Sequence, residues 1–289
     1  MSSQVWRIVY QTVRQIDKKI PQPKRRPEFS DVLIVAMYLW AAAHDRPQGW
    51  ACRRSSYGSM FRPRRLPSQS RFSRRLRNGR CYALLDGVYR ALARTVEPTP
   101  VATLDGRPFP VGACSKDREA RAGRIRGGFA RGYRLHQIVT EDQRVLCWSV
   151  TAMNVSEERE ARTLIPATTL GRLLLADAVY DSSDLYDLAE AQGSQLVAGI
   201  RAHRCHSALR TRHSSPARLR AVRAWTHGVA KYVHRDRTNI ERVFAQQSSY
   251  GGGLGPLPAW VRSLPRVRRW IGAKLILHHA RLIQRSTAA

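Results

Sequence analysis

The chain has 289 residues and carries 50 Lys and Arg against 21 Asp and Glu, a formal net charge of +29. Hydrophobic residues make up 43% of it, which is enough for a core and excludes a wholly disordered basic tail. Because so large a cationic excess repels itself in a compact state, we expect a polyanionic partner such as nucleic acid.

The apolar runs and the cysteines exclude further classes of protein. The longest apolar run, residues 32–43, is shorter than the roughly 20 residues that a membrane-spanning helix requires. The N-terminus lacks the apolar stretch and cleavage site of a signal peptide. The five cysteines are scattered without C-x-x-C spacing, so neither a disulfide framework nor a zinc site is indicated. We expect a cytoplasmic, nucleoid-associated protein without a membrane partner.

Residues 1–98 are predicted to form a small, basic and mostly helical DNA-binding region. Apolar spacing predicts helices over residues 5–16 and 33–43, the second capped by Ser30 or Asp31. A third helix is predicted over residues 68–77, with Ser68 as its cap and Asn78-Gly79 at its end. The basic residues of this third helix suit a helix-turn-helix-like DNA contact, but a solvated basic face is an equal alternative. They are Arg71, Arg74, Arg75 and Arg77.

Residues 99–289 are predicted to form an α/β domain. Short β-type runs at 101–104, 133–140 and 145–151 are followed by a helix at 156–164, a strand at 173–176, a helix at 182–191 and a strand at 195–200. Residues 112–132 form a loop rich in Gly and Arg, and residues 201–230 are basic and irregular. Two more helices are expected, over 232–247 and 267–284.

Three acidic residues lie where surface solvation does not predict them. Asp105 and Asp177 each follow an apolar strand, and Glu241 lies beside the apolar stripe of the helix 232–247. Singly, Asp105-Gly106 could be a turn, Asp177 a helix cap and Glu241 a surface partner of Arg237. Together they suit Mg²⁺ or Mn²⁺, which prefer oxygen ligands and promote phosphoryl transfer in pairs.

Four motifs, three of which each contain one of these residues, resemble the DDE transposases of bacterial insertion sequences, in the RNase H-like, or retroviral-integrase-like, superfamily. The resemblance covers residues 67–283. Its motifs are L-D-G-R-P-F-P-V at 104–111, G-G-F-A-R-G-Y-R-L-H-Q-I-V at 127–139, L-L-A-D-A-V-Y-D at 174–181 and R-x-x-x-E-R-x-F at 237–244. The chain departs from the family pattern at Val179, where Gly is frequent, at His234, where Tyr is frequent, and at Ser248, where Lys is frequent.

The resemblance implies an RNase H-like mixed sheet flanked by helices, with the first strand beside the fourth. It implies that Asp105, Asp177 and Glu241 are the catalytic residues and hold two Mg²⁺ or Mn²⁺ ions. It also implies cleavage of double-stranded DNA at element ends, strand transfer into target DNA, and a homodimer assembled on DNA. The arginines expected to contact DNA are Arg71, Arg74, Arg75, Arg126, Arg131 and Arg237.

Two other functions fit the same residues. One is an RNase H-like metal-dependent nuclease that cuts without joining, and the other is a catalytically inactive DNA-binding remnant. His136 and His234 are candidates for a supporting role at the site or for ordinary core or surface histidines. Four further acids are expected to serve the fold, with Asp181 capping the helix that follows it. They are Asp117, Asp142, Asp181 and Asp184.

Overall fold

A computed structural model describes residues 1–25, 27–94, 99–112, 114–200 and 215–287. The chain divides into two compact units. The first unit comprises Met1–Arg94, Gln246–Val261 and Pro265–Ala289, and the second comprises Thr95–Ala245 and Arg262–Leu264. The predicted domains, 1–98 and 99–289, differ from this division because residues 246–261 and 265–289 pack with the N-terminal helices. The assignment of residues 99–289 as the catalytic domain stays a prediction.

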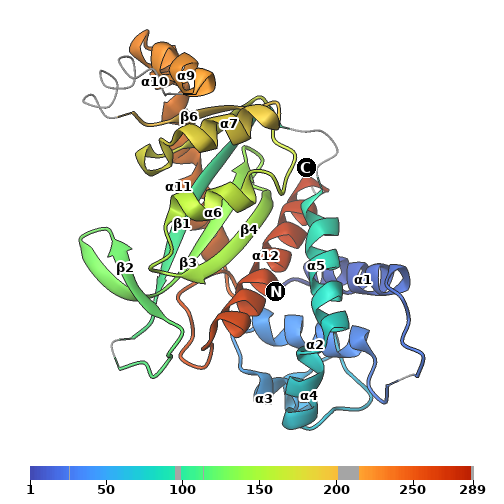
Figure 1. Ribbon diagram of the computed structural model, residues 1–289. Coiled ribbons are helices and arrows are strands. Elements are labelled where there is room, and N and C mark those ends of the chain that lie inside the picture. The colour runs from blue at the N-terminus through green and yellow to red at the C-terminus, as the bar shows by residue number, and fades with distance from the viewer. Residues whose placement is uncertain (26, 95–98, 113, 201–214, 288–289) are drawn as a thin grey trace. The chain divides into compact units, whose positions relative to one another are not determined.

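The first unit is helical, and polar caps fix where its helices begin (Figure 1). The side chains of Ser2, Ser30, Ser68 and Asn78 each accept a hydrogen bond from a backbone N–H of the first turn. Ser30 rather than Asp31 is therefore the cap of the second helix. The helices are α1 (Ser3–Lys19), α2 (Asp31–Ala43), α3 (Gln48–Ala51), α4 (Gln69–Leu76), α5 (Gly79–Ala93) and α12 (Leu264–Ser286), with a 3-10 turn, η1 (Arg54–Ser56).

The C-terminal helix α12 belongs to the core of this unit. Lys274 is 1% exposed, and its ammonium group donates to the carbonyl of Ala42 at 2.6 Å and to Asp45 at 2.5 Å. The rings of His279 on α12 and Tyr89 on α5 lie 5.4 Å apart. These buried contacts join the two ends of the chain within one unit.

The second unit is built on a mixed six-stranded sheet with the order β2-β3-β1-β5-β6, in which β4 also pairs with β3. The pairs β1–β3, β2–β3 and β3–β4 are antiparallel, whereas β1–β5 and β5–β6 are parallel. This α/β arrangement confirms the predicted RNase H-like fold, with the first strand central. The strands are β1 (Val101–Pro110), β2 (Arg121–Ile125), β3 (Gly128–Thr140), β4 (Val145–Ala152), β5 (Leu173–Ala176) and β6 (Gln195–Ala198).

Two strand predictions were wrong. The first strand does not end at residue 104 but continues to Pro110, because β3 pairs with it from Ala102 to Pro110. Residues 112–132 are not all loop, since Arg121–Ile125 forms β2 and Gly128 begins β3. The hydrogen bonds of these long antiparallel ladders override the weak apolar pattern of the segments.

Helices cover both faces of the sheet. The bounds of these elements are α6 (Glu157–Leu164), η2 (Ala178–Tyr180), α7 (Ser183–Ala191), α9 (Pro216–Thr226), α10 (Val229–His234), η3 (Arg235–Thr238) and α11 (Asn239–Ser248). Residues 215–230 are thus not irregular, because Ser215 caps α9 and Pro216 begins it. The single helix expected over 232–247 is divided into α10, η3 and α11. Residues 201–214 of the expected basic stretch lie outside the described residues.

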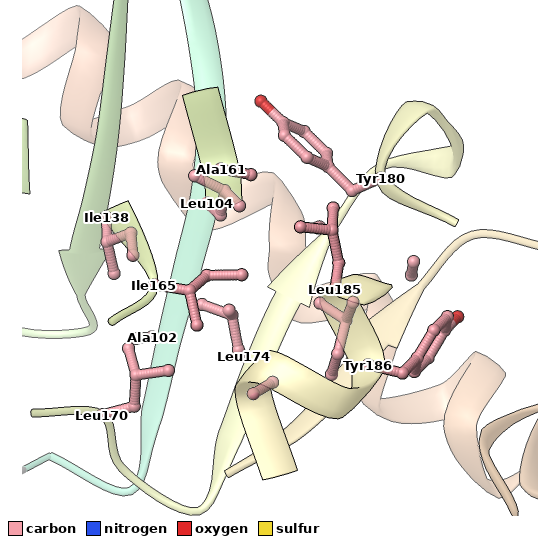
Figure 2. Close-up of a cluster of buried hydrophobic side chains, with 14 of the residues drawn as sticks. Ala102, Leu104, Ile138, Ala161, Ile165, Leu170, Leu174, Tyr180, Leu185 and Tyr186 are labelled. Carbon is pink, nitrogen blue, oxygen red and sulfur yellow. The ribbon is translucent and has the colours of Figure 1, made fainter. Parts of the chain in front are cut away.

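The central strand β1 presents alternate residues to two different layers. Ala102 and Leu104 pack with Leu174 and the apolar side chains of α6 and α7, as Figure 2 shows. Val101 and Thr103 line a small pocket on the other face together with residues of α11. Asp105 and Gly106, which come next on β1, therefore face opposite layers.

Among the described residues, no helix is long and apolar enough to cross a bilayer.

Candidate active site

Asp105 and Asp177 lie at the same level of two neighbouring parallel strands. The last residues paired between β1 and β5 are Leu104 and Ala176, and one aspartate follows each of them. Asp105 and Asp177 thus lie next to each other where the pairing of β1 with β5 ends, as predicted. Asp105 lies within β1, however, and not at the end of that strand.

The Asp105 carboxylate is unusually placed for an acid. Burial raises its pKa to about 7, and the negative charges of Asp177 and Glu157 act in the same direction. Two groups oppose this rise. The N–H of Gly106 donates to Oδ1 at 2.7 Å, and Nη1 of Arg237 lies 3.7 Å from Oδ2. Asp105 is therefore a half-buried carboxyl group with a raised pKa, and the cationic side chain that approaches it is Arg237.

Asp177 has a second, structural duty. Its Oδ1 accepts a hydrogen bond of 2.7 Å from the N–H of Val179 and caps the 3-10 turn η2. The alternative interpretation of Asp177 as a helix cap is therefore correct for the turn η2. The other carboxylate oxygen is not used by this cap, so capping and a role beside Asp105 are compatible.

The structure adds an acid that the sequence reasoning missed, Glu157 at the start of α6. Its carboxylate is paired with Arg134 of β3 and accepts a hydrogen bond of 3.1 Å from the Tyr180 hydroxyl. Burial raises the pKa of Glu157, Arg134 opposes the rise, and Asp177 adds to it. A Cβ at Gly106 would lie 2.8 Å from Glu157 Oε2. Gly106 therefore makes room for this carboxylate and does not form a turn.

Glu241 lies on α11, which packs on the other face of β1. Its neighbours Ile240 and Val243 are buried and Glu241 itself is exposed. Arg237, one turn earlier, approaches Asp105 as described above. Among the described residues, no three His, Cys, Asp or Glu side chains gather closely enough to hold a metal ion. The structure thus brings Asp105, Asp177 and Glu157 into electrostatic contact and does not bring Glu241 into this group.

The chemistry of the two aspartates nevertheless fits a divalent cation. Hard ions such as Mg²⁺ prefer carboxylate oxygens, and the negative charge of Asp177 helps to raise the pKa of Asp105 on the neighbouring strand. A cation bound between them would remove that repulsion. Asp105 and Asp177 are therefore the residues most suited to hold one.

The two histidines differ in their surroundings. His136 is fully buried, its Nε2 lies 2.8 Å from Thr151 Oγ1, and burial lowers its pKa to about 4, so it is a neutral core residue at pH 7. His234 donates from Nε2 to the carbonyl of Ala176 at 2.8 Å. His234, at a position where the family often has Tyr, thus supports the backbone next to Asp177.

The four acids expected to serve the fold all have protein partners. Asp142 pairs with Arg144, Asp184 with Arg162, and Asp117 accepts hydrogen bonds described below. The prediction that Asp181 caps the following helix was wrong. Asp181 is buried and forms a two-bond ion pair with Arg218, and Ser182 occupies the cap position of α7.

The six arginines expected to contact DNA fall into two groups. Arg71 pairs with Glu28 and Arg75 with the buried Asp31, while Arg131 donates to three backbone carbonyls, including those of Ala120 and Ser115. These three guanidinium groups have partners within the protein, and their contact with DNA stays a prediction. The other three either face solvent or lie at the acidic site; they are Arg74, Arg126 and Arg237.

The family model for the transposase DDE domain matches residues 98–253, which is more than half of the chain and includes Asp105, Asp177 and Glu241. The chain therefore belongs to the DDE transposase family. No curated protein matches it.

Proposed function

We propose that this chain is the transposase of an insertion-sequence element, and that it cleaves DNA at the element ends and joins them to target DNA. The observation that supports this most is the pair Asp105 and Asp177, which follow the last paired residues of β1 and β5 inside the region matched by the family. The net charge of +29 suits a DNA substrate. The working form proposed is a homodimer on double-stranded DNA, in the cytoplasm at the nucleoid.

The proposed catalytic residues are Asp105, Asp177 and Glu241, with Asp105 and Asp177 holding two Mg²⁺ or Mn²⁺ ions and Glu241 completing the set. Bound ions of this kind lower the pKa of water or of a hydroxyl group and stabilise a leaving oxygen. Because Glu241 is exposed and outside the acidic group, we propose that α11 moves toward Asp105 when DNA binds.

The chain's own residues supply positioning. Arg134 and Tyr180 hold Glu157 in place. From the α6 side of the sheet, Glu157 adds a negative charge near the two aspartates. Arg237 neutralises part of that field from the α11 side. With a cation held at Asp105, the guanidinium of Arg237 would be available to bind a phosphate oxygen of the DNA.

The proposed reaction has two displacements at phosphorus. Water first attacks the phosphodiester at the element end and releases a 3′-OH. This hydroxyl group then attacks a phosphodiester of the target, forming one bond as another breaks. Neither step needs a covalent link between protein and DNA.

Strand transfer by Asp177→Asn tests the proposal. With Mg²⁺ and duplexes taken from the inverted repeats flanking the gene, the variant should lose strand transfer by at least 1,000-fold, an order of magnitude typical of essential catalytic groups, while its affinity for DNA in a gel shift stays unchanged. The matched control is Asp184→Asn, an acid of the same unit with a 67% exposed side chain, which should transfer strands normally.

Four results would overturn parts of this proposal. Strand transfer that persists in Asp177→Asn would remove this carboxylate from the site. A wild-type protein that cleaves but never joins would be a nuclease, and one that binds without cleaving would be an inactive remnant. Calorimetry could show that Glu157→Gln loses Mn²⁺ binding and that Glu241→Gln does not. The third carboxylate that holds the ions would then be Glu157 on α6 and not Glu241 on α11.

A further inference from the structure

The hairpin formed by β2 and the start of β3 has no role in the proposed chemistry. Residues 126 and 127 join its strands, and Arg124 pairs with Phe129 across it. Gly127 has a φ of +86°, which a residue with a side chain rarely adopts. In Figure 1 the hairpin extends away from α6 and α7, the helices that cover the sheet. It is therefore a projection of the second unit.

The hairpin has one packed face and one free face. A Cβ at Gly123 would lie 2.2 Å from the carbonyl oxygen of Met153, so this face lies directly on the β4 end. Phe129, on the other face, is 79% exposed, the most exposed of the large hydrophobic residues described. A phenylalanine ring that stays in water contributes no burial to folding, and this ring is open to a partner.

The base of the hairpin holds Phe129 in place. The guanidinium of Arg131 donates to the carbonyls of Ala120 and Ser115 at 2.9 and 3.1 Å. The Tyr133 hydroxyl donates to Asp117 at 2.7 Å, and the same carboxylate accepts the N–H of Ser263 at 2.9 Å. The aromatic side chain is thus presented by an anchored strand pair.

The charged side chains carried by the hairpin itself are all positive. Every charged residue between positions 121 and 131 is an arginine, and Arg124 and Arg126 are exposed. Among the described residues, no carboxylate pairs with either of them. A symmetric contact between two copies would bring equal charges together and is therefore disfavoured. An exposed aromatic ring between arginines instead has the chemistry of a nucleic-acid contact, in which the ring meets bases and the arginines meet phosphates.

We propose that the β2–β3 hairpin is a DNA-binding element in which Phe129 stacks on a base and Arg124 and Arg126 bind the flanking phosphates. This inference rests on the proposed function, which makes DNA the substrate.

The sheet also gives the distance between Phe129 and Asp105. Asp105 pairs with Gln137 on β3, eight residues from Phe129. At about 3.3 Å per residue of strand the two sites are about 26 Å apart. For a duplex that runs along β3, at 3.4 Å per base pair, this distance corresponds to roughly eight base pairs from the scissile phosphate.

Binding of element-end duplexes, followed by fluorescence anisotropy in EDTA, tests the hairpin without requiring catalysis. Phe129→Ala should weaken binding by about 5- to 100-fold, the effect of losing one stacked base, and Phe129→Trp should restore it. The matched control is Tyr232→Ala, which removes an aromatic residue that is 73% exposed on α10 and should bind like wild type. A photo-crosslinking phenylalanine analogue at position 129 should react roughly eight base pairs from the cleavage site.

Equal affinity of Phe129→Ala and wild type would overturn the inference. So would a change in solution mass of Phe129→Ala with unchanged DNA affinity, which would assign the hairpin to contacts between copies. A crosslink confined to the scissile position would overturn the spacing. If Asp177→Asn retained strand transfer while Phe129→Ala lost affinity, the assignment of the acidic site would fail and the hairpin would stand.

Discussion

Helix α4 and the β2–β3 hairpin are both rich in arginine, yet the structure uses their charge in different ways. On α4, Arg71 pairs with Glu28 and Arg75 pairs with the buried Asp31. On the hairpin, Arg124 and Arg126 are exposed, and the described residues offer them no carboxylate. Arginine density alone therefore does not identify a DNA-binding surface. What distinguishes Arg71 and Arg75 from the two hairpin arginines is that each of them has an acid within reach.

The largest expected effect is on stability, at Asp31. This carboxylate is 4% exposed and is shared by Arg75 and Arg80, the latter at 2.7 Å. Asp31→Ala leaves both cations without it, and we expect a loss of about 3–5 kcal/mol in the free energy of unfolding, measured with urea. Glu28→Ala, which removes a half-exposed partner of Arg71, should cost less than about 1 kcal/mol. Equal losses in the two variants would contradict the stabilising role of the buried pair between Asp31 and Arg75 of α4.

A smaller effect is expected on the salt dependence of DNA binding. The double change Arg124→Ala with Arg126→Ala should reduce the slope of log affinity against log salt by about 2, one for each lost phosphate contact. Its free energy of unfolding should stay within about 0.5 kcal/mol of wild type. Arg71→Ala should leave the slope unchanged, because its guanidinium is paired with Glu28. A slope reduced equally by Arg71→Ala would break the comparison.

The smallest effect concerns the acid that anchors the hairpin, Asp117. Burial alone would raise its pKa, but hydrogen bonds from Ser263, Tyr133 and Glu119 outweigh burial and lower it. The stability that Asp117 contributes is therefore present above its unfolded pKa of about 3.9 and is lost as pH falls through the lower folded pKa. Thermal unfolding between pH 5 and pH 2 should show a decline that Asp117→Asn reduces. An unchanged decline in the variant would remove Asp117 from the anchor.

The strands β1, β3, β4, β5 and β6 and the positions of Asp105 and Asp177 after two of them could be predicted from sequence, because apolar runs mark the strands and each aspartate directly follows one. The pairing of β1 with β5 was implied by the resemblance to the family and not by the runs themselves. β2 could not, since R-A-G-R-I lacks an alternating apolar pattern and depends on its pairing with β3. Glu157 could not either, because only the folded chain brings α6 beside Gly106. The signal that was available is the glycine after Asp105, which can mark a close approach as well as a turn.

The two ends of the chain meet in the first unit, and this has a consequence for synthesis on the ribosome. Helices α1, α2 and α5 leave the exit tunnel well before α12, whose Lys274 and His279 pack against α2 and α5. About 170 residues must be translated in between, which takes on the order of ten to thirty seconds at typical elongation rates. During that interval the nascent N-terminal helices expose the apolar surface that α12 later covers, and they are a natural client for chaperones.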